Sequence, residues 1–109
     1  MKSSSGRPNL QTIRDAQQEF ADQCALIEET LTDNFQFLLF RENYPYKSFL
    51  GNAGNGLSQK VIINTAEWKV TVQELEGADP VSQCVFNVIH NRSEGLAKKV
   101  LAVVKANRE

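Results

Sequence analysis

Between Leu10 and Leu31, mostly apolar residues recur at alternating spacings of three and four. This spacing follows the 3.6-residue turn of an α-helix and places the side chains on one stripe. The sequence therefore predicts an amphipathic helix over about residues 10–33, with Asn9 as a suitable N-cap. The stripe consists of Leu10, Ile13, Gln17, Phe20, Cys24, Ile27 and Leu31.

A stripe of this length can be buried in two ways. It can pair with a second copy of itself, or it can pack on a sheet formed by the same chain. Gln17 and Cys24 interrupt the apolar seam, and the flanking positions show no regular pattern of charges. The sequence favours packing within the chain and leaves a homodimer as an alternative.

The segment after the helix is rich in aromatic residues, which favour β-structure. We predict a strand over 35–42 and then a bend or an edge segment over 46–50, because Pro45 cannot donate a ladder hydrogen bond. Gly51–Gly56 contains three glycines and predicts a mobile loop. The apolar residues of the first strand, expected in the core, are Phe35, Phe37, Leu39 and Phe40.

The remaining pattern predicts more strands and a second helix. Residues 60–65 and 68–75 suit a hairpin, with Trp68, Val70 and Val72 on one face. Residues 84–90 suit a central strand, because both faces of that segment are mostly apolar. Asn91 or Ser93 is expected to cap the second helix, the former with Glu94 as in a capping box. Its inner stripe is Leu96, Val100, Val103 and Val104.

The expected fold class is α+β: a helix, an antiparallel meander of three to four strands, and a helix, with both helices packed on one sheet face. A chain of 109 residues, 41% of them hydrophobic, is long enough for one core. We therefore expect a disordered tail over 1–8 and a single domain over 9–109. Without an apolar leader or a membrane span in the sequence, a cytoplasmic protein is expected.

The residues that could carry chemistry do not form a catalytic set. His90 and Cys84 lie six residues apart on one predicted strand, and the rise per residue separates them by about 20 Å. Cys24 falls on the buried stripe, where a thiol behaves as a small apolar group. Two cysteines and one histidine suit neither a disulfide framework nor a zinc site. We therefore expect that the protein is not an enzyme and that it binds neither a metal nor a cofactor.

The leading functional hypothesis is a small non-enzymatic adaptor, inhibitor or assembly factor that binds a protein partner. Two tyrosines flanking Pro45 offer contact area, and the glycine-rich loop, expected to lie beside them, offers adaptable contacts. Acidic residues on the first helix offer orientation. The residues expected to bind the partner are Tyr44, Tyr46, Asn52, Asn55, Asp15, Glu19, Asp22 and Glu29.

The alternative is nucleic-acid binding, with basic side chains as phosphate contacts and the aromatic segment 35–49 as a stacking platform. A formal net charge of -1 argues against a general polyanion binder but permits a local basic patch. A small-molecule pocket between helix and sheet is the third possibility. The basic residues of the alternative are Arg41, Lys47, Arg92, Lys98, Lys99, Lys105 and Arg108.

Overall fold

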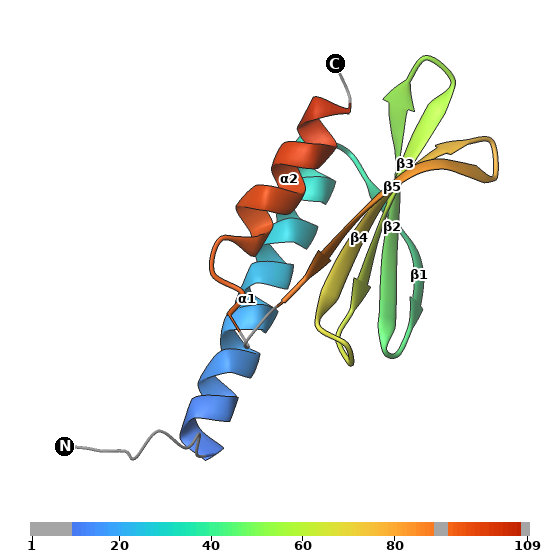
Figure 1. Ribbon diagram of the computed structural model, residues 1–109. Helices are drawn as coiled ribbons and strands as arrows, with labels where there is room; N and C mark the ends of the chain where they lie inside the picture. The colour runs from blue at the N-terminus through green and yellow to red at the C-terminus, as the bar shows by residue number, and fades with distance from the viewer. Residues whose placement is uncertain (1–9, 89–91, 108–109) are drawn as a thin grey trace.

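The computed structural model describes residues 10–88 and 92–107 and shows an α+β arrangement in the expected order, helix, strands, helix (Figure 1). The sheet has five strands, so the expectation of three to four was wrong. Asn9, His90, Asn91, Arg108 and the tail over 1–8 lie outside the described residues. The elements are α1 (Leu10–Asn34), β1 (Leu38–Asn43), β2 (Tyr46–Gly54), β3 (Leu57–Asn64), β4 (Lys69–Glu76), β5 (Asp79–Asn87) and α2 (Leu96–Ala106).

The strands form an antiparallel meander in the order β1-β2-β3-β4-β5. Consequently β5 is an edge strand, and the expectation that 84–90 is central was wrong. Its apolar residues are shared between two environments: Phe86 packs against the core, whereas Val85 on the other face is exposed. Apolar residues on both faces of β5 therefore did not indicate a central strand with a hydrogen-bonded neighbour on each edge.

The segment over 46–54 is a strand, not a bend followed by a mobile loop. β2 continues through four of the expected loop residues, and the turn itself is Asn55-Gly56. Gly51 permits this continuation because the ring of Phe37 lies directly over it, where an added Cβ would come within 2.6 Å of the ring. Gly54, with φ of 86°, suits the turn because glycine adopts positive φ without strain.

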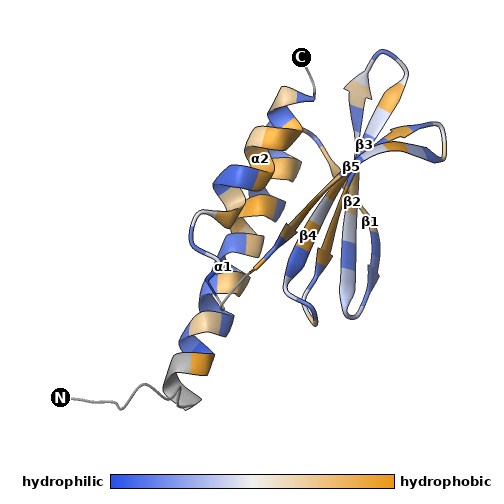
Figure 2. Cartoon of the chain, in the orientation of Figure 1, coloured by the Kyte–Doolittle hydropathy of each residue, from blue (hydrophilic) through white to orange (hydrophobic). Residues whose placement is uncertain are grey.

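The core lies between the two helices and the sheet (Figure 1). Figure 2 shows hydrophobic residues along both helices and in the parts of β4 and β5 nearest to them. From Phe20 onward the α1 stripe is buried, whereas Ile13 is 41% exposed. The buried cluster comprises Phe20, Cys24, Ile27, Leu31, Phe37, Phe49, Val61, Ile63, Val70, Val72, Leu96, Ala97, Val100 and Val104.

Two residues expected in the core are instead half exposed. Leu39 and Phe40 are each 50% exposed, because β1 is an edge strand and a bulge between Leu39 and Arg41 shifts its register against β2. A bulge re-aims the side chains of the strand that contains it. Phe37, just before β1, is buried as expected, and Phe35 is partly buried.

The N-terminus of α2 is capped by side chains of α1. Gly95 occupies the N-cap position with φ of 76° and makes no side-chain cap bond, so the Ser93 cap was wrong. The backbone N–H of Ala97 donates to Oε1 of Gln23 at 2.8 Å, and Ser93 donates through its N–H and its hydroxyl to Oε1 of Glu19 at 3.2 and 3.3 Å. The side chain of Gln23 thus satisfies an amide of the first turn that a local cap would otherwise bond, and Glu19 holds the segment just before it.

The C-terminal half of α2 is fastened to the sheet by a buried side chain. Gln59 of β3, fully buried, donates from Nε2 to the backbone oxygen of Val104 at 3.1 Å. Among the described residues, no helix is long and apolar enough to cross a bilayer.

Candidate functional site

One face of the sheet is turned away from the helices, and we call it the open face. Strand residues alternate between faces, and the pairing register carries this alternation from strand to strand. Phe49, Val61 and Val72 are paired in register and belong to the buried core. Their chain neighbours Leu50, Ile62 and Thr71 therefore point to the open face. Neither helix covers this face in the described structure (Figure 1).

The open face carries a group of apolar side chains that remain accessible. Leu38 is 75% exposed, Phe40 is 50% exposed and Tyr46 is 51% exposed, all near the β1–β2 edge. Large side chains exposed together on one surface are typical of an interaction site. The apolar residues that the register and the Lys60–Phe40 contact place on this face are Leu38, Phe40, Tyr46, Leu50, Ile62, Leu75 and Val85.

The charged side chains of the open face are basic. Nζ of Lys60 lies 4.9 Å from the centre of the Phe40 ring, and the guanidinium carbon of Arg41 lies 5.7 Å from it. These distances permit cation–π attraction. The carboxylates within the five strands all lie on the opposite face of the sheet. These residues are Glu42, Glu74, Glu76 and Asp79.

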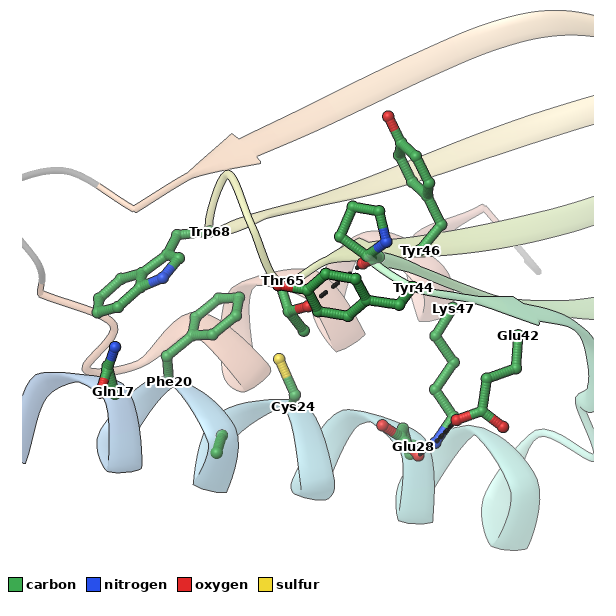
Figure 3. Close-up of a pocket in the computed structure, with 12 residues that line it drawn as sticks. Gln17, Phe20, Cys24, Glu28, Glu42, Tyr44, Tyr46, Lys47, Thr65 and Trp68 are labelled. Atoms are coloured by element: carbon green, nitrogen blue, oxygen red, sulfur yellow. Dashed lines mark hydrogen bonds and ion pairs between the residues drawn. The ribbon is translucent and has the colours of Figure 1, made fainter. Parts of the chain in front are cut away.

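A pocket of about 530 Å³ lies on the other side of the sheet, and we call it the helix–turn pocket. Its walls come from α1, from the β1–β2 hairpin around Pro45, and from the turn between β3 and β4 (Figure 3). The two turns are joined because Thr65 donates through its N–H and its hydroxyl to the backbone oxygen of Pro45, at 3.0 and 3.3 Å. This connection fixes one wall of the pocket.

The pocket has an aromatic end and a charged end. At the aromatic end, the rings of Phe20 and Trp68 stack with centroids 5.3 Å apart. At the charged end, Nζ of Lys47 lies 2.8 Å from Oε1 of Glu28 and 3.8 Å from Oε2 of Glu42. Figure 3 shows Cys24 between the two ends.

The ionisable groups of the pocket differ in how strongly they are held. The hydrogen bond to Glu28 raises the pKa of Lys47 above its ordinary value of 10.5, so this ammonium stays protonated. Burial, reinforced by the charge of Glu28, raises the pKa of the Cys24 thiol to about 12, although Lys47 acts in the opposite direction. Cys24 is therefore a neutral thiol and a poor nucleophile at neutral pH.

The structure separates the two parts of the predicted partner surface. Tyr44, 83% exposed, and Tyr46 lie at the β1–β2 turn, whereas Asn52 and Asn55 lie at the far end of the β2–β3 hairpin. Along β2 that separation is about 25 Å at the usual rise of a strand. The loop does not lie beside the tyrosines, contrary to the expectation, because β2 runs unbroken between them.

The acidic residues on α1 differ in their surroundings. Asp15, Asp22 and Glu29 are exposed along the helix, and Asp22 accepts a hydrogen bond from Gln18. Glu19 accepts the two hydrogen bonds from Ser93 that help to hold the N-terminal end of α2. The role of Glu19 in the described structure is thus internal.

The basic residues of the nucleic-acid alternative are spread over several surfaces. Arg41 lies on the open face, whereas Lys47 lies on the opposite face in an ion pair with Glu28. The exposed positions on or just before α2 are Arg92, Lys98, Lys99 and Lys105.

Sequence reasoning missed the residues that dominate the open face. Phe40 was assigned to the core, and Lys60 was not selected at all. The alternation of side chains along β2 and β3 could have placed Leu50 and Ile62 on one face. The bulge in β1 breaks this alternation, so it could not have placed Phe40 there.

In the described ranges, no three metal-binding side chains gather into a possible site. Comparisons with known protein families, curated proteins and solved structures find no match.

Proposed function

We propose that this protein is a small non-enzymatic module that binds a protein partner through the open face of its sheet. The observation that carries the proposal is the exposed group around Leu38, Phe40 and Tyr46, bordered by Arg41 and Lys60. Aromatic residues and arginine are enriched at protein interfaces, and a few such residues usually carry most of the binding energy.

The charge of the open face indicates the chemistry of the partner. Arg41 and Lys60 flank the apolar group, and the carboxylates of the strands lie on the other face of the sheet. A partner that complements this face presents apolar side chains flanked by aspartate or glutamate. An amphipathic acidic helix meets both requirements, since it can lay its apolar stripe on the sheet and its carboxylates beside the cations.

The aliphatic character of the face favours a protein over a nucleic acid. Leu38, Leu50, Ile62 and Val85 supply most of its apolar residues, whereas binding of single-stranded nucleic acid depends on aromatic rings that stack on bases. The basic residues of α2 are also not part of this face, so the phosphate contacts that they would make in the alternative lie on a different surface from Arg41.

Selection from a displayed library of helix-forming peptides tests the proposal with a defined ligand pool. We expect enrichment of sequences with apolar residues at helical spacing and a net negative charge. Phe40→Ser and Arg41→Glu should each lower the affinity of the protein for the purified peptide at least tenfold. Lys98→Glu, which makes the same charge change on α2, should leave its affinity within about twofold.

Other outcomes would contradict the proposal. Enrichment of basic peptides, or equal binding by Arg41→Glu, would exclude the charge argument. Salt-sensitive binding of single-stranded RNA that Lys98→Glu abolishes would favour the nucleic-acid alternative. A wild-type dimer in light scattering that Phe40→Ser makes monomeric would mean that a second copy covers the face.

A further inference from the structure

The helix–turn pocket lies on the side of the sheet opposite the open face, so its occupant is a separate question. Its volume of about 530 Å³ falls within the range of small-molecule sites, about 300–1,000 Å³. The hydrogen bonds from Thr65 to the Pro45 oxygen join two of its turns without any ligand. The pocket is thus largely formed in advance, which lowers the ordering cost of binding.

The apolar part of the pocket suits a hydrocarbon or aromatic body. The stacked rings of Phe20 and Trp68 form one end, and the neutral thiol of Cys24 lies beside them. Tyr44, which also lines the pocket, is 83% exposed and can turn its ring toward a ligand at little cost. Aromatic faces attract cations as well as apolar groups.

The charged part of the pocket has an excess of negative charge. Glu28 and Glu42 line it against the single cation Lys47, and Lys47 is already held by Glu28 at 2.8 Å. Glu42, at 3.8 Å from the same ammonium and with its side chain 63% exposed, is the more loosely paired of the two carboxylates and can reach a ligand.

We propose that the helix–turn pocket binds a small organic cation, an ammonium group on an apolar body, with Glu42 facing the ammonium. The body lies against Phe20 and Trp68, and the ring of Tyr44 covers the cationic end. An anionic ligand of the same shape is disfavoured because it would have to displace Glu28 from Lys47 and then leave two carboxylates without a cation.

A matched set of probes tests the charge assignment directly. The ligands are 4-phenylbutylamine, 4-phenylbutanol and 5-phenylpentanoate, which share a phenyl ring and differ in the charge of the head group. Trp68 is the single tryptophan of the chain, so its fluorescence reports binding at the pocket. We expect saturable binding of the amine, at least tenfold weaker binding of the alcohol, and the weakest binding for the acid.

Variants of the full chain separate the pocket from general surface charge. Glu42→Gln should lower the affinity for the amine about three- to tenfold and have little effect on the affinity for the alcohol. Glu29→Gln, on the same helix as Glu28 but outside the pocket lining, should leave the amine unaffected. Ala21→Leu, at an exposed lining position, should narrow the pocket and weaken all three probes without unfolding the protein.

Three results would overturn the assignment. They are binding of the acid as tight as that of the amine, equal amine affinity in the Glu42→Gln and wild-type proteins, and no saturable fluorescence change with any probe. Tyr46 borders both the pocket and the open face, but Phe40 and Arg41 do not line the pocket, so the variants that test the open face leave the pocket lining unchanged.

Discussion

At the scale of single residues, Gly51 shows how one missing side chain permits a local packing arrangement. In the interior of a strand, replacing glycine with alanine ordinarily favours folding by about 0.5–1 kcal/mol. Here the added Cβ would lie 2.6–2.8 Å from three atoms of the Phe37 ring. We expect Gly51→Ala to lower the free energy of unfolding by about 1–3 kcal/mol in urea denaturation.

The same contact supplies its own control. Phe37→Leu leaves space over residue 51, so the loss caused by Gly51→Ala should shrink in the double variant. A double-mutant cycle measures this difference as a coupling energy. Strictly additive effects of the two substitutions, or a stabilising Gly51→Ala, would contradict the close approach as the reason for the glycine.

At the scale of elements, the capping of α2 by α1 couples the two helices. Gln23→Ala removes the acceptor for the Ala97 N–H and should cost about 0.5–2 kcal/mol of unfolding free energy, the usual range for a lost cap. Amide hydrogen exchange should increase first in the N-terminal turn of α2, because that turn loses its partner.

A matched substitution on the same helix isolates the cap from helix propensity. Gln18→Ala removes an exposed hydrogen bond to Asp22 within α1 and should change stability by less than about 0.5 kcal/mol. If Gln18→Ala and Gln23→Ala had equal effects, or if exchange in α2 did not change, the contact between the helices would not be the source of the stabilisation.

At the scale of the whole molecule, two groups at the helix–sheet boundary predict a loss of stability at alkaline pH. The pKa of Cys24 is raised from 9.0 to about 12, so between these values the unfolded chain loses the thiol proton while the folded chain retains it. The stabilisation is complete below pH 9 and declines as pH rises toward 12. The raised pKa of Lys47 acts in the same direction above its ordinary 10.5.

Urea denaturation between pH 7.5 and 11 measures this effect. Cys24→Ala and Cys24→Val should both be less stable than the wild type at pH 7.5, because each disturbs a buried site. Their stability should nevertheless decline less steeply above pH 9, since neither side chain has a proton to lose. Parallel curves for the wild type and both variants would show that the thiol does not contribute.

The periodic patterns identified most of the elements. The stripe over 10–31 predicted α1 within one residue at its C-terminal end, and the apolar pattern of Leu96, Val100 and Val104 predicted the buried face of α2. Val70 and Val72 were placed correctly on one buried face of β4. These successes have one cause: an amphipathic pattern is local, and it specifies both the element and the side that must be buried.

Contacts between distant segments decided the rest. The sequence could not show that Phe37 would lie over Gly51 and allow β2 to continue, or that Glu19 and Gln23 would bond the N-terminal end of α2. It also could not show that the β1 bulge would turn Phe40 outward, or that Tyr44 and Trp68 would line one pocket with α1. By itself the sequence determined most of the elements, their inner faces and the antiparallel meander, because periodicity and short connections are local. The tertiary structure alone decided how far β2 extends, how α2 is capped and where both candidate sites lie, because these depend on groups that meet only after the chain has folded.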